Sequence, residues 1–280
     1  MSNFVKWAGG KKQLLEQYKN FFPKQLKRYF EPFVGSGAIA FHIAQNHNPK
    51  EVFLSDINEE LINCYNMIKY NKDELLEILQ TYKENHTKET YYKIRSQNPK
   101  ELLDIYRAAR FIYLNKTCFN GLYRVNSKGE FNVPMGTYKS PAFPDEEEMS
   151  VIASMLANIQ ISAKDFEAIL PEARKGDFIY FDPPYHPLNN SKSFTTYTKD
   201  DFKEEDQKRL AELFRALDKK GCSVMLSNSD TDLIKKLYKG FNINTVKASR
   251  MINSDGSKRG KINELVITNY PVNTTGVSDL

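Results

Sequence analysis

The stretch of the sequence with the clearest chemical potential is Asp182-Pro183-Pro184-Tyr185, which directly follows the apolar run 177–181. An amino group on an aromatic ring is a poor nucleophile because its lone pair is delocalised into the ring. Asp182 and the backbone carbonyl of Pro183 can each accept one N–H bond from such a group, which frees its lone pair. The prolines fix φ and carry no N–H, so the Pro183 carbonyl keeps its direction toward the amino group. The pattern predicts attack by an aromatic amino nitrogen on a methyl sulfonium.

The aromatic ring of Tyr185 completes this constellation. An extruded base could stack on it, an interaction worth about 1–3 kcal/mol per base in single-strand binders. Ligands of open α/β sheets bind beyond the carboxyl ends of the strands, so we expect the tetrapeptide at the active edge of a sheet. A Pro-Pro loop with a capping Asp182 is the alternative, but it leaves the combination of strand end, acid and aromatic ring unexplained. We interpret Asp182, Pro183, Pro184 and Tyr185 as catalytic.

A second constellation lies nearer the N-terminus, where Gly35-Ser36-Gly37 separates an apolar run from a helical pattern. Glycines there allow a sharp turn and close approach to a ligand. Asp56 ends the next apolar run, where a carboxylate can accept both hydroxyls of an adenosine ribose. The third glycine of the dinucleotide fingerprint is replaced by Ala40, which disfavours a nicotinamide. A tight turn and a helix cap are the alternatives, but together the features favour a nucleoside cofactor.

The elements that must position these residues follow from the hydrophobic pattern. Short apolar runs alternate with helical patterns, and Asn58 is expected to cap the helix after the second run. This alternation predicts an α/β fold, a Rossmann-like and mainly parallel sheet with helices on both faces. The predicted strands lie at residues 29–33, 51–54, 177–181, 223–227 and 265–267.

The segment 69–149 breaks this rhythm and is interpreted as an inserted, mostly helical domain, whose candidate role in recognising DNA follows from the loop 115–126 described below. It is helical at 74–83 and 105–114, and then loop-like, with Asn, Gly and aromatic residues. The acidic run 145–148 is expected to begin a helix, because carboxylates suit the positive end of the helix dipole. The predicted organisation is a cofactor-binding and catalytic domain of residues 1–68 and 150–270, the insertion 69–149, and a disordered tail, 271–280.

Five segments, in order along nearly the whole chain, resemble the motifs of the Dam-like adenine-N6 DNA methyltransferases (the α group, or D12 class). They are 6–11, 31–37, 55–56, 165–166 and 182–185, and the last matches without substitution. The resemblance implies a class I methyltransferase fold, S-adenosylmethionine as cofactor, and transfer to N6 of a flipped adenine in duplex DNA. The cofactor-binding residues that it implies are Trp7, Lys11, Phe33, Gly35, Gly37, Asp56, Asp165, Phe166 and Asp182.

Three of these assignments have alternatives when the residues are taken alone. Lys11 could meet the cofactor carboxylate or be an exposed helix lysine. Trp7 is the single tryptophan and could belong to the core. Asp165, which by resemblance bonds the amino group of the cofactor adenine, could instead cap a short helix over 166–170.

The loop 115–126 has residue types suited to reading DNA. Arg124 can bond bidentately to O6 and N7 of guanine. Phe119 can wedge into the base stack and fill the space of a flipped adenine. Asn120 can bond a base edge or a phosphate, and Leu122 can touch a thymine methyl.

A β-hairpin with its turn at 128–129 and locally packed aromatic rings is the alternative for this loop. The family resemblance extends through it to Tyr138. It implies that Arg124, Leu122 and Pro134 read part of a GAT-containing site, for which we predict GATC. The residues expected to contact DNA are Lys6 at a neighbouring guanine, together with Phe119, Asn120, Leu122, Arg124, Pro134 and Tyr138.

The composition is that of a soluble globular protein, with 280 residues, 27% of them charged, and a net charge of +5. Cys64, Cys118 and Cys222 lie far apart without metal-site spacing, which predicts reduced thiols, no metal and a cytoplasmic location. No apolar run is long enough to cross a membrane. We expect double-stranded DNA as the partner, a monomer in solution, and a companion restriction endonuclease as a candidate partner.

Two further segments are candidates for DNA contact. The basic loop 250–261 could meet phosphates, and 193–197 could close over the flipped base. Two alternative functions stay open. The tetrapeptide could serve on RNA adenine or on a protein glutamine, although glutamine enzymes usually carry Asn before the prolines. The chain could also be a catalytically inactive DNA-binding regulator, against which the intact Asp182 and Asp56 argue.

Overall fold

The fold is taken from a computed structural model, which describes residues 4–7, 9–138, 140–188, 202–249 and 261–272. Three predicted features lie wholly or mostly outside these residues. They are the segment 193–197, the basic loop 250–261 apart from the backbone of its last residue, and the tail 271–280 beyond its first two residues.

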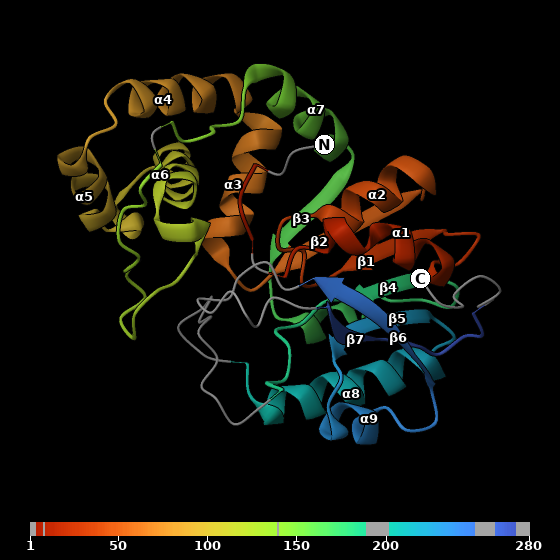
Figure 1. The fold of residues 1–280 in the computed structure, drawn as a ribbon. Coiled ribbons are helices and arrows are strands. Elements are labelled where there is room, and N and C mark those ends of the chain that lie inside the picture. Colours follow the sequence, from red (N-terminus) through yellow and green to blue (C-terminus); the bar gives the residue numbers. More distant parts are fainter. Residues whose placement is uncertain (1–3, 8, 139, 189–201, 250–260, 273–280) are drawn as a thin grey trace.

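A seven-stranded sheet forms the centre of the molecule, in the order β3-β2-β1-β4-β5-β7-β6 (Figure 1). The five strands from β3 to β5 in this order are mutually parallel, and β7 runs antiparallel to both of its neighbours. The predicted mainly parallel sheet is therefore confirmed. The strands are β1 (Arg28–Glu31), β2 (Glu51–Asp56), β3 (Ile159–Ala163), β4 (Phe178–Phe181), β5 (Ser223–Ser229), β6 (Asn242–Ser249) and β7 (Lys261–Thr268).

The two strands that the sequence did not predict, β3 and β6, are the two edges of the sheet. Only Ile159 is buried among the five residues of β3, and in β6 buried Val246 and Ala248 alternate with polar residues. Edge strands contact one neighbour and bury less surface, so they lack the continuous apolar run that marks a central strand. The hydrophobic pattern therefore found the centre of the sheet and missed its edges.

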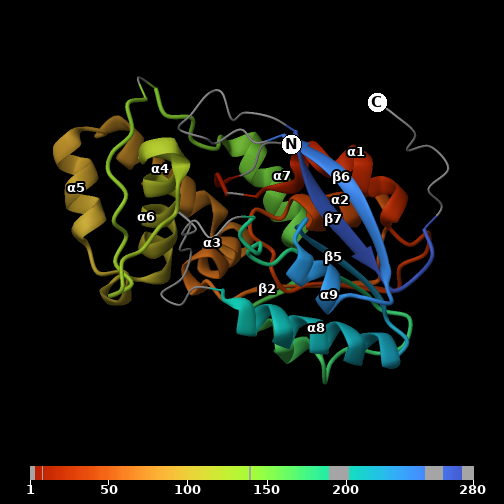
Figure 2. The same cartoon turned by 60° about the horizontal axis from the view of Figure 1, so that its bottom comes forward.

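Helices cover both faces of the sheet, as predicted (Figures 1 and 2). Tyr180 and Met225 point to the cluster that contains the residues of α1, α2, α3 and α7, whereas Phe181 and Leu226 point to the cluster of α8 and α9. The helices are α1 (Leu15–Tyr18), α2 (Ala38–Asn46), α3 (Glu59–Tyr70), α4 (Lys72–Glu84), α5 (Lys88–Ser96), α6 (Asp104–Thr117), α7 (Glu146–Leu156), α8 (Glu204–Lys219) and α9 (Asp232–Leu237), with short 3-10 helices η1 (Lys11–Leu14), η2 (Lys19–Phe21), η3 (Pro99–Glu101), η4 (Phe119–Gly121) and η5 (Phe166–Ile169).

Two helix starts confirm expectations from the sequence. The Asn58 side chain accepts the Leu61 N–H at the start of α3, and Asp145 accepts the Glu148 N–H at the start of α7. Each cap satisfies a donor that the first turn of a helix leaves without an intrahelical partner. Asn58 thereby fixes the point at which the chain turns from β2 into α3.

The segment 69–149 contributes α4, α5 and α6, which stand to one side of the sheet (Figure 1). Leu75, Leu79 and Phe111 of this segment belong to the same buried cluster as Leu61 of α3. A smaller cluster around Tyr91 and Tyr113 lies farther out. The predicted boundary between residues 149 and 150 lies inside α7, so the chain returns to the sheet within a helix.

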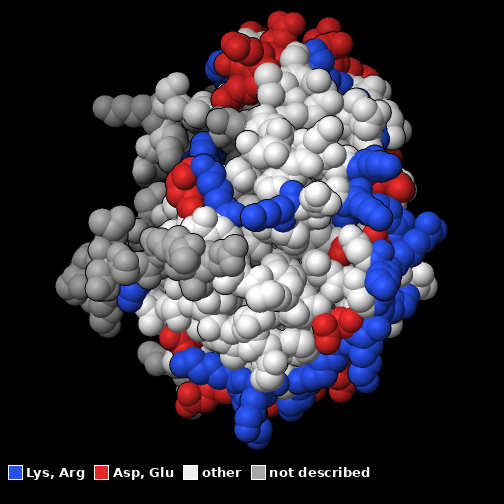
Figure 3. Space-filling view, turned by 90° about the vertical axis from the view of Figure 1, so that its right-hand side faces the viewer, with Lys and Arg blue, Asp and Glu red and all other residues white. Residues whose placement is uncertain are grey.

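Charge is unevenly spread over the surface. On the face drawn in Figure 3, Lys and Arg follow the right-hand and lower margins, and Asp and Glu gather at the top. No helix within the described ranges is long and apolar enough to cross a membrane.

Candidate active site at the carboxyl ends of the strands

The predicted catalytic residues lie where the sheet changes its direction of growth. The chain builds β2 and β3 on one side of β1 and then places β4 on the other side. Ligands of such sheets bind at this switch point, beyond the carboxyl ends of the strands. Asp182 directly follows β4. The Gly35 turn comes after β1, and Asp56 is the last residue of β2. One edge of the sheet thus brings together residues that are far apart in the chain.

Two side chains hold the carboxylate of Asp182. Lys11 Nζ lies 2.8 Å from its Oδ2, and Ser227 Oγ donates to its Oδ1 at 2.7 Å. Lys11 is 4% exposed and Asp182 is 19% exposed, so the ion pair is shielded while one side of the carboxylate stays accessible. Charge-assisted bonds of this kind are stronger than neutral ones. The carboxylate is therefore fixed before any ligand arrives.

Lys11 lies against the predicted catalytic tetrapeptide 182–185, a position that the sequence did not indicate. Its Nζ also donates to the Gly9 carbonyl at 2.5 Å and lies 4.8 Å from the centre of the Tyr185 ring. It is buried at the start of η1, so the alternative of an exposed helix lysine is wrong. A role for Lys11 toward the cofactor stays a prediction.

The hydroxyl of Tyr185 is held by a residue from another strand. Its hydroxyl donates to Glu264 Oε2 at 2.9 Å, and Glu264 lies on β7, 79 residues farther along the chain. Burial raises the pKa of Glu264 and that of Tyr185. For the phenol this favours the neutral form, which donates the hydrogen bond. No sequence pattern marked Glu264.

The glycine turn after β1 lies against Trp7. Gly35 and Gly37 have φ of +47° and +73°, in the left-handed region that favours glycine. A Cβ on Gly35 would lie 2.8 Å from Cδ1 of Trp7. Trp7 is half-buried and stacks on Phe111 and Tyr123, with ring centres 6.3 and 5.8 Å apart. It therefore belongs to an aromatic cluster and also borders the turn.

Asp56 faces the same turn. Its carboxylate accepts the Gly35 N–H at 3.2 Å and the Asn58 N–H at 3.0 Å. Burial raises its pKa to about 6. Asn58, not Asp56, is the N-cap of α3, so the capping alternative for Asp56 does not hold. Its carboxylate can still accept donors from a ligand, because a carboxylate has about four lone-pair positions.

Phe33, Asp165 and Phe166 come together next to this turn. The rings of Phe33 and Phe166 are stacked with centres 5.4 Å apart. Asp165 accepts the Glu167 N–H at 2.9 Å as N-cap of η5, and also Arg209 Nη2 at 3.2 Å. The capping role considered from the sequence is thus present. Bonding of Asp165 to a cofactor adenine stays a prediction.

Two residues predicted to contact DNA meet although 132 positions separate them. Lys6 Nζ lies 3.2 Å from the Tyr138 hydroxyl and 4.2 Å from the centre of its ring. The backbone of Lys6 is fixed by Asn115, whose side chain accepts its N–H at 2.7 Å and donates to its carbonyl at 2.8 Å. The N-terminal arm and the end of α6 therefore present one surface.

The backbone after Leu122 forms the hairpin considered as an alternative. Val125 and Phe131 form an antiparallel bridge, and Gly129 has φ of +81° in the turn between them. Arg124 is half-buried, and its Nε donates to Asn132 Oδ1 at 2.8 Å. The hairpin does not exclude base reading, because the guanidinium of Arg124 has further N–H donors besides the Nε group bonded to Asn132.

The other predicted DNA contacts differ in exposure. Phe119 is 50% exposed, and its N–H donates to the carbonyl of Pro134, which is also exposed. Asn120 has φ of +55°, and Leu122 is half-buried against the cluster around Tyr113. Phe119 and Pro134 are therefore two exposed apolar residues whose backbones are hydrogen-bonded.

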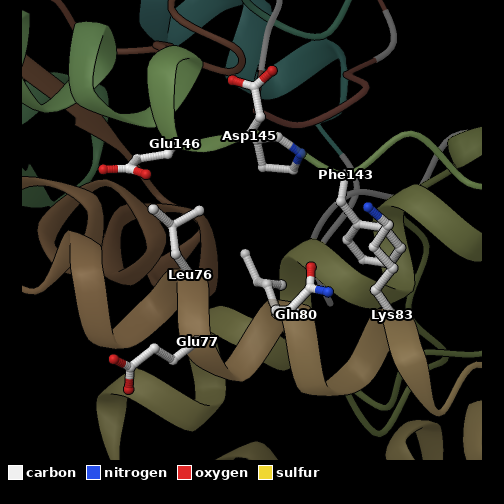
Figure 4. Close-up of a pocket in the computed structure, with 9 residues that line it drawn as sticks. Leu76, Glu77, Gln80, Lys83, Phe143, Asp145 and Glu146 are labelled. Atoms are coloured by element: carbon white, nitrogen blue, oxygen red, sulfur yellow. The ribbon is translucent and has the colours of Figure 1, made fainter.

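A cavity of about 520 Å³ lies elsewhere, between α4 and the start of α7 (Figure 4). Leu76 and Gln80 of α4 face Phe143 and Asp145 across it. None of its lining residues was predicted to belong to the site. In the part of the chain that the structure describes, no group of three or more His, Cys, Asp or Glu side chains could hold a metal ion.

Comparison with known proteins decides the family. The model of the D12 class N6 adenine-specific DNA methyltransferases matches residues 7–252. The chain belongs to this family. The resemblance noted from the sequence is confirmed, and the protein is an adenine-specific DNA methyltransferase.

Three relatives match over nearly their whole length. The chain is 49% identical to the type II methyltransferase M.MjaIII of Methanocaldococcus jannaschii, over 95% of this chain and 98% of that one. It is 45% identical to the type II methyltransferase M1.LlaDCHI of Lactococcus lactis, over 95% of each chain. It is 37% identical to the DNA adenine methylase of Escherichia coli, over 96% of this chain and 95% of the other.

Membership in the D12 class decides between the activities considered above. It favours DNA over RNA or protein as the substrate, and an enzyme over an inactive regulator. A methyltransferase needs a methyl donor, and the family implies S-adenosylmethionine.

The structure places at this site several residues that the sequence did not predict. Ser227 and Asn228 follow one another at the carboxyl end of a predicted strand, and this polar pair was an available signal. Glu264, Gln207 and Arg209 reach the site from β7 and α8, and no motif or spacing marked them.

Proposed function

We propose that this enzyme methylates N6 of an adenine flipped out of duplex DNA, within GATC, with S-adenosylmethionine as donor. The observation that carries the proposal is the carboxylate of Asp182, held by Lys11 and Ser227 beside the ring of Tyr185 at the switch point of the sheet. A carboxylate accepts hydrogen bonds and cannot donate them, which suits an amino group.

The proposed mechanism rests on the orientation of the acceptor amino group. Asp182 and the Pro183 carbonyl each accept one N–H of the adenine, and its lone pair turns out of the ring. When bound, S-adenosylmethionine supplies a methyl group on a positively charged sulfur. After transfer, the surplus N6 proton lies next to Asp182, whose partial exposure gives it a path to water. Tyr185 supports the face of the flipped base.

The cofactor would lie against the residues at the ends of β1 and β2. Gly35 and Gly37 form a left-handed turn, and the Asp56 carboxylate beside it has further lone-pair positions besides those that accept the Gly35 and Asn58 N–H groups. Both features fit a nucleoside. We assign the ribose to Asp56 and the turn of Gly35 and Gly37 to the close approach of the cofactor. Phe33, Asp165 and Phe166 would hold its adenine, and Trp7 and Lys11 its remaining polar groups.

The insertion 69–149 is proposed to recognise DNA, with residues 1–68 and 150–270 forming the cofactor-binding and catalytic domain. The proximity of Lys6 and Tyr138 supports a DNA surface to which the N-terminal arm also contributes. Exposed Phe119 supports the wedge. In this proposal Arg124, Leu122 and Pro134 read part of GATC, Asn120 contacts a base edge or phosphate, and Lys6 reaches a neighbouring guanine.

Further properties follow from the proposed substrate and are predictions from the sequence. We expect a monomer that acts on DNA in the cytoplasm. A companion restriction endonuclease is a candidate partner, supported by two relatives whose names describe type II methyltransferases.

The test is methylation of plasmid DNA followed by sequencing of the modified adenines. We expect N6-methyladenine at GATC in plasmids incubated with the wild-type enzyme. Plasmids incubated with the Asp182→Ala variant should contain none. That variant should lose methyl transfer by more than about 10³-fold while its affinity for S-adenosylmethionine falls only modestly. Methylation at another sequence would contradict the site, and near-normal turnover of Asp182→Ala would contradict the mechanism.

A further inference from the structure

Two buried amide side chains lie directly behind the catalytic tetrapeptide. Gln207 of α8 is 1% exposed and Asn228 of β5 is fully buried. The Nδ2 of Asn228 donates to Oε1 of Gln207 at 3.0 Å, so the two amides form one unit that joins a helix to the sheet. Buried amides are rare unless they are hydrogen-bonded. This pair is therefore expected to have a specific role.

Both amides bond to the backbone on the two sides of Tyr185. Gln207 Nε2 donates to the Pro184 carbonyl at 2.9 Å. Asn228 Oδ1 accepts the His186 N–H at 3.1 Å. The two bonded atoms belong to the two peptide planes that flank the Cα of Tyr185.

Fixing these two planes fixes the backbone of Tyr185. The φ and ψ of a residue are the rotations of its two flanking peptide planes about the Cα. With both planes bonded to one amide unit, the direction of the Cα–Cβ bond of Tyr185 is set. The hydroxyl of the same residue is bonded to Glu264 at 2.9 Å. The ring is thus held from its backbone and from its far end.

The amide unit is itself anchored. Asn228 Oδ1 also accepts the Ser229 N–H at 2.8 Å, and Ser229 Oγ donates to the His186 carbonyl at 2.5 Å. The loop after Tyr185 is therefore bonded to β5 at two consecutive positions. These bonds to β5 therefore set the position of the loop after Tyr185.

We propose that Gln207 and Asn228 are positioning residues for methyl transfer, which set the ring of Tyr185 and the adjacent prolyl carbonyls for the flipped adenine. This inference rests on the proposed function, since it requires that Tyr185 and Asp182 receive the base. Neither amide touches the substrate. Their effect passes through the two peptide planes.

Loss of the Gln207 donor leaves the Pro184 carbonyl without this hydrogen bond and frees the peptide plane before Tyr185 to rotate. A displacement of about 1 Å at a reacting centre can cost about 10²-fold in rate. The cofactor residues Gly35 and Asp56 belong to other strands and keep their contacts. The expected signature is therefore a lower kcat with unchanged cofactor affinity.

The main experiment compares Gln207→Met with a control, Asn269→Leu. Asn269 is a half-buried amide that bonds to Val224 N–H, Asp218 and the Cys222 carbonyl at the opposite end of β5. Both substitutions replace an amide by an apolar side chain of similar size. We expect kcat of Gln207→Met to fall by about 10-fold to 10²-fold, with S-adenosylmethionine affinity within about twofold. Asn269→Leu should lose thermal stability but keep its kcat.

A second variant separates positioning from a general loss of packing. Gln207→Glu keeps the length of the side chain and the acceptor for Asn228, but its carboxylate cannot donate to Pro184 O. Once protonated it can donate again, and burial raises the pKa of such a group. Its kcat, relative to wild type at each pH, should therefore recover as pH falls, whereas Gln207→Met should show no recovery. The ionisable side chains next to it are the same in wild type, namely Tyr185 and His186 at the bonded peptide planes and Lys203, Glu204 and Asp206 at the start of α8.

Three outcomes would be informative. Normal kcat of Gln207→Met overturns the positioning role. Equal losses of kcat in Gln207→Met and Asn269→Leu, without recovery of Gln207→Glu at low pH, would also overturn it, because a general loss of stability would then explain the result. Failure of the proposed function is distinguishable, since it would show as near-normal turnover of Asp182→Ala in the same assay.

Discussion

The catalytic tetrapeptide and the segment around Arg124 differ in how their side chains are held. Asp182 and Tyr185 are each bonded to side chains from other elements, including buried Lys11. The Arg124 side chain donates to Asn132 within its own hairpin, and Phe119 is half exposed. The side chains of Asp182 and Tyr185 are thus held by contacts from other elements, whereas the side chain of Arg124 is bonded within its own hairpin.

This difference agrees with the role proposed for each region. Transfer to a weakly nucleophilic amino group needs acceptors already in place, since reorientation at the moment of reaction costs rate. Side chains that read a groove meet DNA only in the complex, and interface side chains commonly change rotamer on binding. We therefore expect substitutions behind the tetrapeptide to lower kcat, and those in the hairpin to change the choice of site.

After Asp182 itself, the largest effect is expected at Lys11. Lys11→Met leaves the partly buried Asp182 carboxylate without its cation, and breaking a buried pair costs about 3–5 kcal/mol. If the pair acts in catalysis, kcat/KM for DNA should fall by about 10²-fold to 10³-fold. Lys12→Met, at the exposed neighbouring position, should change kcat/KM less than about threefold. Similar values for both variants would remove the contrast between the two regions.

A smaller effect, of a different kind, is expected at Arg124. One bidentate contact with guanine contributes about 1–3 kcal/mol of discrimination. Arg124→Ala should therefore lower the preference for GATC over sites with the guanine changed by about 10-fold to 10²-fold, while kcat stays nearly constant. Lys128→Ala removes one positive charge from the exposed turn of the same hairpin and should leave the preference intact. Unchanged discrimination by Arg124→Ala would show that another residue reads this base.

The smallest effect is expected from the protonation of Asp56. Because burial raises its pKa to about 6, the carboxylate is ionised at pH 7.5 and mostly protonated at pH 5. Affinity for S-adenosylmethionine, measured by calorimetry, should be about tenfold weaker at pH 5 than at pH 7.5. Asp56→Asn should bind weakly at both values. An equal pH dependence in that variant would assign the effect to another group.

The same shift gives a prediction for stability without ligand. A carboxyl whose pKa is raised on folding favours the folded state when protonated, and this contribution is lost as pH rises from about 4 through about 6. Asp56→Asn should therefore be at least as stable as wild type at pH 7. A lower free energy of unfolding there would show that its hydrogen bonds to Gly35 and Asn58 outweigh its burial.

Local patterns predicted the elements that bury the most apolar surface. The four central strands, β1, β2, β4 and β5, were placed to within a few residues, because their apolar runs have few alternatives. The edge strands β3 and β6 were missed, since half-exposed strands mix polar and apolar residues. The boundary at residue 149 was placed inside α7, because the insertion shares its core with the sheet.

The sequence by itself determined the chemistry of this protein. Asp182-Pro183-Pro184-Tyr185, the Gly35 turn and Asp56 are short motifs whose residue types and order indicate the reaction before any contact is known. Only the tertiary structure showed what holds them. The contacts from Lys11, Gln207, Ser227, Asn228 and Glu264 join elements far apart in the chain. Such contacts leave no local pattern, because they depend on which strands and helices become neighbours when the sheet forms.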